Sequence, residues 1–437
     1  MEFEIKLPSI TRFILIAVFF LTLGLAGGYF YKAKISPTPE QSVDKEAENI
    51  RIAFLMEVYD KVQENYWEKI TDESLVKIFV LGMEKLSGQP QNLKKQDREN
   101  LEKALIQIDS QIDSEEKQKE FVSKLADVVL ANLEPFGRSR LYIQKDEIAL
   151  KNNVQNKTEV NHYEVLGIEK EASTEEIEKA YQEKEAELKD DTSEEGQKKY
   201  QEVVQAGKVI ADTGAKKLYD QAGIEPTMDY SLVRPEILHL HIKKFSPTTL
   251  EELERVTKKV DQGDQLDTLI LDLRDNIGGA IDGLPYFLGP FIGNDQHAYQ
   301  FYHQGEKEDY KTKMGWMPSL IRYKKVVVLI NEAAQSSAEV MAAVLKKYNV
   351  GVLVGKTTKG WGTVERVFKL DNQIDENEEY SMFLVHRVTL REDSQLIEGR
   401  GVDPVIDIES PNWKSELLDR FNYPELVEAV DEIWQKV

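Results

Sequence analysis

The chain has 437 residues, 41% of them hydrophobic, a formal net charge of −22 at pH 7 and no cysteine. Such a length suggests two to four domains with a sizeable core, and the negative charge argues against a nucleic-acid-binding protein, because phosphate contacts need clustered lysine and arginine. The lack of cysteine excludes disulfides, a thiol nucleophile and thiolate metal sites. The six histidines show no metal-ligand spacing, so we expect neither a metal ion nor a cofactor.

An apolar run near the N-terminus predicts a membrane anchor. Residues 13–31 carry no charge, are mostly apolar and have about the length that the hydrocarbon core of a bilayer requires. The aromatic residues at 29–31 suit the membrane interface. A cleaved signal peptide is the alternative, but no small-x-small cleavage site follows cleanly. We therefore predict a single-pass anchor, whose flanking charges leave the orientation open.

The next part of the chain predicts a short polar linker and a charged helical region. Pro37 and Pro39 stand in the linker, which covers residues 35–46. Four stretches then carry apolar residues at helical spacing, at residues 52–59, 75–86, 101–108 and 121–133. We interpret these helices as a scaffold, followed by a loop and a short extended piece at residues 133–143.

Residues 158–225 indicate a separate helical module. Its first long helix is expected to begin at residues 173–176, where a serine precedes an acidic turn. A second helix is expected at about residues 193–211, and a shorter segment at 215–219 closes the module.

This module resembles the J-domain of co-chaperones in four phrases, at residues 163–167, 179–181, 206–212 and 217–221. The His-Pro-Asp loop of that family falls on residues 189–191, Lys-Asp-Asp, which keep only the aspartate. The preceding helix is basic in the family but acidic here at residues 182–187. Since a reversed charge should repel a chaperone partner, we expect a structural or protein-binding module instead.

The remainder, residues 233–410, has an α/β pattern. Two expected strands at residues 237–242 and 266–273 flank a helical stretch at 250–260. The second strand leads into a Gly278–Gly279 turn, which opens an expected helix near residues 280–288. Glycines let the backbone approach a ligand closely and aim N–H groups at it, although most such turns are only tight connections.

A serine follows a third buried strand. Residues 326–330 predict the strand, 331–335 a turn, and 336–345 a helix that opens on two serines with an acidic first turn. A hydroxyl at such a strand-to-helix turn is exposed beside free backbone N–H groups and the positive end of a helix dipole. Ser336 is therefore a candidate nucleophile.

The chain resembles the family of C-terminal processing, or tail-specific, serine peptidases in four ordered phrases, at residues 133–143, 271–279, 328–340 and 396–404. The resemblance implies an α/β fold: a crotonase-like αβ peptidase core with an N-terminal helical region. It also implies a polypeptide substrate, cut near an exposed C-terminus outside the cytoplasm. We therefore expect a membrane protein of the bacterial cell envelope, with most of its chain extracytoplasmic.

The resemblance also assigns site residues. The nucleophile falls on Ser336, and the oxyanion donors would be the backbone N–H groups of Gly278 and Ser337. The general-base lysine of the family falls on Trp361, and the glutamine partner of that lysine falls on Glu365. No cofactor-binding residue or metal ligand is implied.

A tryptophan cannot replace the lysine, because an indole N–H only donates hydrogen bonds. Removing one member of a nucleophile–base unit costs about 10⁴ to 10⁶ in rate. Lys359 is a candidate substitute base if the turn is extended, although glycines on both sides of Trp361 make simple alternation doubtful. Glu365 would also favour the charged form of a lysine.

Two hypotheses follow: a membrane-anchored serine peptidase with an altered base, or a catalytically silent protein that binds polypeptides or acts as a scaffold. A membrane-tethered co-chaperone is a third. The PDZ module that the family carries between its helical region and its core is replaced here by the J-domain-like module. The expected domains are an anchor (1–34), a linker and helical region (35–157), the J-domain-like module (158–225), the core (226–412) and a C-terminal helix (413–437).

Overall fold

The structure is a computed structural model that describes residues 43–260, 266–391 and 393–436. The predicted anchor at residues 13–31 lies outside this range. Among the described helices, none is both long and apolar enough to cross a bilayer. The chain divides into two compact units, Met1–Ala47 and Glu48–Val437, and every described strand belongs to the second.

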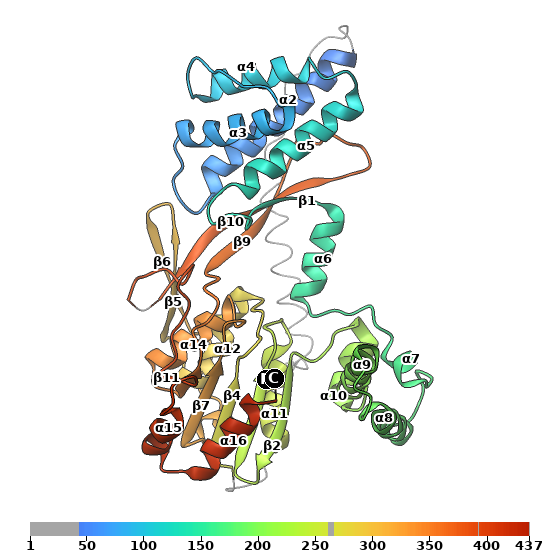
Figure 1. Ribbon diagram of the computed structural model, residues 1–437, viewed down its shortest axis with the longest axis vertical. Coiled ribbons are helices and arrows are strands. Elements are labelled where there is room, and N and C mark those ends of the chain that lie inside the picture. Colours follow the sequence, from blue (N-terminus) through green and yellow to red (C-terminus); the bar gives the residue numbers. More distant parts are fainter. Residues whose placement is uncertain (1–42, 261–265, 392, 437) are drawn as a thin grey trace, which may run out of the picture. The chain divides into compact units, whose positions relative to one another are not determined.

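Four helices form where the N-terminal periodicity predicts them (Figure 1). They are α2 (Val43–Asn65), α3 (Asp72–Ser87), α4 (Arg98–Asp109) and α5 (Glu115–Ala131). The last three begin at Thr71, Asp97 and Ser114, whose side chains each accept a hydrogen bond from the backbone N–H three residues later. The apolar faces of the helices form one core with residues of the long strand β10 (Tyr380–Leu390).

Strand β10 organises an antiparallel sheet. It pairs with β1 (Arg140–Ile143), β9 (Thr363–Lys369) and β5 (His297–His303), and β5 pairs with β6 (Glu306–Lys311). The pairing of β10 with β9 shifts register between Val385 and Arg387. Helix α6 (Gln144–Val154) follows β1.

A second, mostly parallel sheet forms the α/β part. Its strand order is β11-β8-β7-β4-β3-β2, and only β2 runs antiparallel to its neighbour. The strands are β2 (Met228–Arg234), β3 (Ile237–Ile242), β4 (Thr268–Asp272), β7 (Lys325–Ile330), β8 (Val352–Gly355) and β11 (Ile406–Asp407). The central strands are continuous apolar runs because both faces of a parallel sheet are covered. The predicted mixed α/β fold is confirmed.

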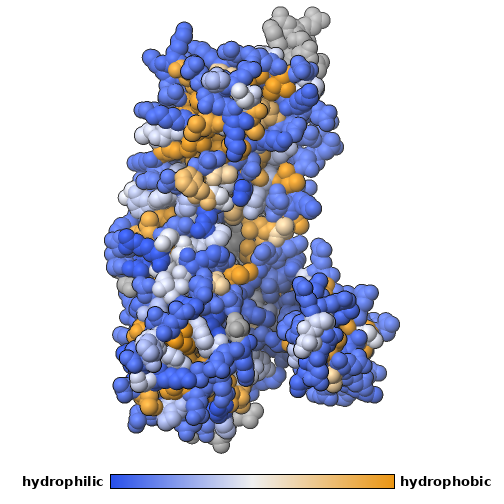
Figure 2. Space-filling model, in the orientation of Figure 1, coloured by the Kyte–Doolittle hydropathy of each residue, from blue (hydrophilic) through white to orange (hydrophobic). Residues whose placement is uncertain are grey.

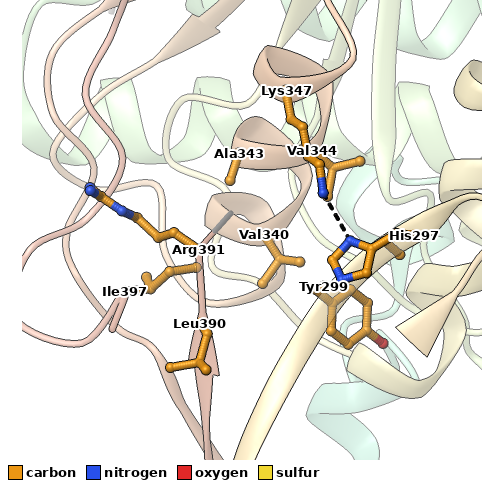
Figure 3. Close-up of a pocket in the computed structure, with 10 residues that line it drawn as sticks. His297, Tyr299, Val340, Ala343, Val344, Lys347, Leu390, Arg391 and Ile397 are labelled. Atoms are coloured by element: carbon orange, nitrogen blue, oxygen red, sulfur yellow. Dashed lines mark hydrogen bonds between the residues drawn. The ribbon is translucent and has the colours of Figure 1, made fainter. Parts of the chain in front are cut away.

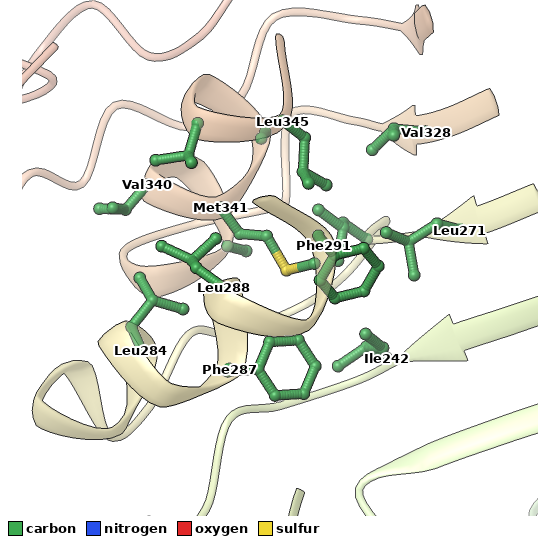
Figure 4. Close-up of a cluster of buried hydrophobic side chains, with 14 of the residues drawn as sticks. Ile242, Leu271, Leu284, Phe287, Leu288, Phe291, Val328, Val340, Met341 and Leu345 are labelled. Carbon is green, nitrogen blue, oxygen red and sulfur yellow. The ribbon is translucent and has the colours of Figure 1, made fainter. Parts of the chain in front are cut away.

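Two sets of helices cover this sheet. The first consists of α11 (Thr249–Val260), a 3₁₀ turn (Ile281–Gly283), α12 (Leu284–Ile292), α13 (Pro318–Ile321) and α14 (Ser337–Lys347). Side chains of α12 and α14 pack over Ile242, Leu271 and Val328 of three adjacent strands (Figure 4). Residues of α15 (Trp413–Phe421) and α16 (Pro424–Trp434) form a separate core with the same sheet.

Two local predictions need correction. The C-terminal region 413–437 contains two helices and not one, because Asn422 takes a left-handed φ of 47° and Pro424 begins a new helix. The helix expected near residues 280–288 begins as a 3₁₀ turn and continues as α12 to Ile292.

The inserted module is all-helical, as predicted. Its helices are α7 (His162–Leu166), α8 (Thr174–Leu188), α9 (Glu194–Ile210) and α10 (Thr213–Ala222), and they enclose a small core of their own. Ser173 and Glu176 cap α8 reciprocally, at the start that the sequence predicts. The domain boundaries themselves stay predictions.

The end of α2 is tied to the antiparallel sheet by two polar side chains. The Gln304 amide donates to the backbone carbonyls of Gln63 and Tyr66, both at 3.1 Å. His386, which lies at the register shift, bonds through Nδ1 to the Asn65 carbonyl at 2.8 Å. These bonds satisfy carbonyl groups that a helix end leaves without partners.

Because of this position, the stability of the protein should depend on pH through His386. Burial lowers the pKa of its ring from 6.5 to about 4, and the nearby His303, Arg366 and Arg387 act in the same direction. Between these two values the unfolded chain takes up a proton that the folded chain does not. The free energy of unfolding should therefore fall by about 2 kcal/mol between pH 7 and pH 5.

Urea denaturation at the two pH values measures this difference. The His386→Asn variant keeps a donor for the Asn65 carbonyl but does not titrate, so its pH dependence should be smaller. An equal pH dependence in both proteins would contradict the assignment to His386.

Candidate active site

Ser336 lies where a parallel strand meets a helix. Strand β7 ends at Ile330, a turn follows, and Ser336 is the N-cap of α14 with a φ of 57° and a ψ of −122°. This conformation is uncommon for a residue with a Cβ atom and is typical of strained functional turns. The side chain is partly exposed, and among the described residues no other side chain hydrogen-bonds to its hydroxyl. The hydroxyl is therefore accessible, but no described side chain activates it.

Glu339 holds the backbone around Ser336. Its side chain is fully buried, and its Oε1 accepts from the Thr358 hydroxyl at 2.6 Å and the Gly360 N–H at 2.7 Å. Its Oε2 accepts from the backbone N–H groups of Ser336 at 2.8 Å and Trp361 at 2.7 Å. One carboxylate oxygen therefore holds both Ser336 and the residue at the base position.

These contacts require an ionised Glu339. Burial raises the pKa of its carboxyl, while the four hydrogen bonds act in the opposite direction. The Thr358 hydroxyl already accepts from the Val402 N–H at 2.7 Å, so its proton points to Glu339. Since every partner is a donor, a protonated carboxyl would leave its own proton without an acceptor.

Gly278 packs directly against Ser336. A Cβ atom on Gly278 would lie 2.6 Å from the Ser336 Cβ, so there is room only for glycine. The φ of Gly278 is 81°, a backbone conformation that also favours glycine. The Gly278 N–H donates to the Asn276 Oδ1 at 2.8 Å. The predicted oxyanion donor is therefore placed beside Ser336, but its proton is already engaged.

The second predicted oxyanion donor is Ser337. It is the first residue of α14, where a backbone N–H has no acceptor within the helix. Its hydroxyl donates to the Gly279 carbonyl at 3.2 Å, which joins the start of α14 to the glycine turn.

The loop that contains Gly278 and Gly279 follows β4, and an ion pair at the end of that strand holds its first residues. Arg274 donates to the fully buried Asp272 through Nε at 2.9 Å and Nη2 at 2.7 Å, and the His239 ring lies 3.0 Å from the same carboxylate. Burial by itself would raise the pKa of Asp272, but His239 and Arg274 hold it well below its ordinary value. The Arg274 guanidinium also lies over the ring of Trp434 in α16.

Trp361 occupies the predicted base position and is fixed on several sides. The Arg138 guanidinium carbon lies 3.4 Å from the centre of its ring, and the Lys359 amine lies 5.0 Å from it. Arg138 also donates to Glu398 at 2.8 Å, and Glu398 accepts from the Gly362 N–H at 2.7 Å. The ring is thus in contact with two cations, an arrangement that favours an electron-rich aromatic side chain.

Glu365, at the position of the family glutamine, lies next to this ring. It accepts from the Thr363 hydroxyl at 2.6 Å. Burial raises the pKa of Glu365, and hydrogen bonds from Thr363 and Trp361 oppose this only in part.

Lys359, the candidate substitute base, is exposed, and its amine donates to the Gln335 Oε1 at 2.5 Å. The structure therefore brings Ser336, Gly278, Ser337 and Trp361 together, but it places the Lys359 amine on a neighbouring side chain.

Sequence reasoning missed the roles of Arg138, Glu398 and Gln335. The first two lie inside phrases that carry the family resemblance, which was the available signal. Gln335 lies in the phrase at residues 328–340, but nothing in that phrase indicated a partner for its side chain.

A small cavity lies beside α14, away from Ser336 (Figure 3). Val340, Ala343 and Val344 line it together with β5, and the Lys347 amine lies 2.9 Å from the His297 Nδ1. Its volume of about 10 Å³ holds roughly one water molecule, so it does not form a ligand site. Hydrophilic residues cover most of the face shown in Figure 2, with hydrophobic residues between them.

Comparison with known proteins gives two matches. Residues 236–408 match Peptidase family S41, and residues 161–220 match the DnaJ domain. The core of this chain is therefore similar to peptidase family S41 over residues 236–408. The S41 segment contains β7, α14 and the turn with Trp361, and the second match covers α7, α8, α9 and most of α10.

Curated relatives are similar to this chain over less than half of its length. The chain is 31% identical over 179 residues to the carboxy-terminal processing protease CtpA of Bacillus subtilis, which covers 40% of this chain and 35% of that protein. It is 29% identical over 178 residues to a probable CtpA-like serine protease of Staphylococcus epidermidis, covering 40% and 34%. The matched region therefore spans about a third of these relatives.

Similar solved structures are more distant in sequence. The photosystem II D1 C-terminal processing protease is 13% identical with a TM-score of 0.45, covering 82% of this chain and 93% of that one. A lipoprotein from Streptococcus agalactiae is 14% identical with a TM-score of 0.43, covering 89% and 100%.

Proposed function

We propose that this protein binds polypeptides at a peptidase family S41 site around Ser336, where peptide-bond hydrolysis is weak or lost. The observation that carries the proposal is the shared Glu339 oxygen, which holds the backbone of Ser336 and of Trp361 at 2.8 and 2.7 Å. The residue that we assign to the base position is therefore held close to the backbone of Ser336, and its side chain is an indole.

The chemistry of the site supports weak hydrolysis. For Ser336 to attack a carbonyl carbon, another group must take the hydroxyl proton, and an indole N–H cannot. The Gly278 N–H, which would stabilise the oxyanion, is bound to Asn276. Weak hydrolysis can still arise because the Ser337 N–H at the start of α14 can stabilise the oxyanion and because binding positions the substrate.

The ligand we propose is the C-terminal part of an extracytoplasmic polypeptide. The S41 match and the CtpA relatives support this class of ligand. We further infer a crotonase-like αβ core, a membrane anchor at residues 13–31 and a place in the bacterial cell envelope, as the sequence predicts.

For the J-domain-like module we propose a structural or protein-binding role. Asp191, which remains from the His-Pro-Asp loop, accepts from the Ser193 N–H at 2.9 Å and from its hydroxyl at 2.7 Å, so it shapes the turn between α8 and α9. The acidic helix α8 disfavours a chaperone partner that binds a basic surface.

A fluorophosphonate probe tests the proposal, because it labels only activated serines. We expect slow labelling of Ser336 in the unmodified protein, none in the Ser336→Ala variant, and equal binding of an unfolded polypeptide by both. Labelling at the rate of a competent serine peptidase would contradict weak hydrolysis. Failure of both proteins to bind unfolded polypeptide would contradict the binding role.

A further inference from the structure

The side chain that precedes Ser336 joins the two loops of the site. The Gln335 amide oxygen accepts from the Lys359 amine at 2.5 Å, and its nitrogen donates to the Ile277 carbonyl at 3.3 Å. The Gln335 backbone N–H donates to the Asn276 carbonyl at 2.9 Å. Gln335 thus connects the glycine loop to the turn that carries Trp361.

The backbone of Lys359 is fixed close to Ser336. Its N–H donates to the carbonyl of Ala334, two residues before Ser336, at 3.0 Å. The flexible four-carbon stem of a lysine lets its amine move over the surface around this fixed point. In the structure, that amine is bonded to the residue directly next to Ser336.

We propose that Gln335 holds the Lys359 amine away from Ser336, and that its release gives Ser336 a proton acceptor. This inference rests on the proposed function, in which Ser336 has no working base. An amide oxygen can only accept a hydrogen bond from the amine, so the bond directs the Lys359 amine at Gln335 and not at the Ser336 hydroxyl. Gln335 is therefore a positioning residue that keeps the site inactive.

The reaction with a fluorophosphonate shows what release would allow. The Ser336 Oγ forms a bond to phosphorus, the phosphorus–fluorine bond breaks, and fluoride leaves with its electron pair. The Ser336 proton passes to the neutral Lys359 amine. Since only a neutral amine can take up the proton, the rate of labelling should rise with pH.

The test compares variants of the full chain at pH 7 and pH 9. Gln335→Ala should label at Ser336 at least about tenfold faster than the unmodified protein at pH 9, because the amine no longer has its hydrogen bond to Gln335 and keeps only its weaker contact with the Trp361 ring. Gln335→Glu keeps an acceptor for the amine and should show no gain. Gln335→Ala with Lys359→Met should lose the gain of the single variant.

Two results would overturn the proposal: no gain in Gln335→Ala at pH 9, or a gain that persists after Lys359→Met. If Gln335→Ala does not fold, Gln335→Met, which fills a similar volume without an amide, takes its place. If the rate of labelling rose in a Trp361→Lys/Glu365→Gln variant but not in Gln335→Ala, only the role of Gln335 would be rejected. Fast labelling of the unmodified protein would instead reject the proposed function.

Discussion

The double substitution Trp361→Lys with Glu365→Gln is expected to raise the rate of fluorophosphonate labelling at Ser336 by about 10² to 10⁴. The backbone at position 361 is already held by the Glu339 oxygen that also holds Ser336. A lysine there would bring an amine to the site. The Arg138 guanidinium, now 3.4 Å from the ring centre, would lower the pKa of that amine, as a base requires.

Single substitutions separate the two contributions. Trp361→Lys by itself should give a smaller gain, because the Glu365 carboxylate would favour the charged amine. Glu365→Gln by itself should give none, because the indole still cannot accept a proton. Labelling rates measured at pH 7 to 9, with Ser336→Ala as the blank, check these results. A folded double variant without any gain would show that a second defect, such as the engaged Gly278 N–H, limits the site.

Glu339→Gln is expected to lower the free energy of unfolding by about 3 kcal/mol or more. The glutamine amide has one oxygen and one NH₂ group, so two of the four donors would face another donor whichever way the amide is turned. The affected donors would be the hydroxyl of Thr358 and the backbone of Gly360, or the backbone groups of Ser336 and Trp361. The polar groups left without an acceptor would be buried in the first case and partly buried in the second.

Urea denaturation at 25 °C measures this loss. Glu306→Gln, at an exposed position in β6, is the matched control and should change stability by no more than about 0.5 kcal/mol. If the two variants were equally stable, Glu339 would not be the acceptor that organises the site. Adding Glu339→Gln to the Trp361→Lys/Glu365→Gln variant should also remove the gain in labelling rate. The backbone N–H groups of Ser336 and of residue 361 would no longer donate to the same carboxylate oxygen.

The sequence predicted the parts of the fold that depend on neighbouring residues. The mostly apolar stretches at residues 237–242, 266–273 and 326–330 contain the buried parallel strands β3, β4 and β7. Strands β9 and β10 were not predicted. The long β10 takes its pairing from β1, β5 and β9 and shifts register near His386, and these features depend on distant partners.

Periodicity, caps and turn residues act over a few positions, so the chain alone determined the strand–turn–helix unit of Ser336, the glycine turn and the helical module. The resemblance in sequence then identified Trp361 as the residue at the base position. Only the tertiary structure decided that Arg138 stacks on Trp361 and binds Glu398, 260 residues away along the chain. It also decided that the Lys359 amine bonds to Gln335. These contacts depend on the path of the whole backbone, because the direction of a long side chain is set by the partners that folding brings near it.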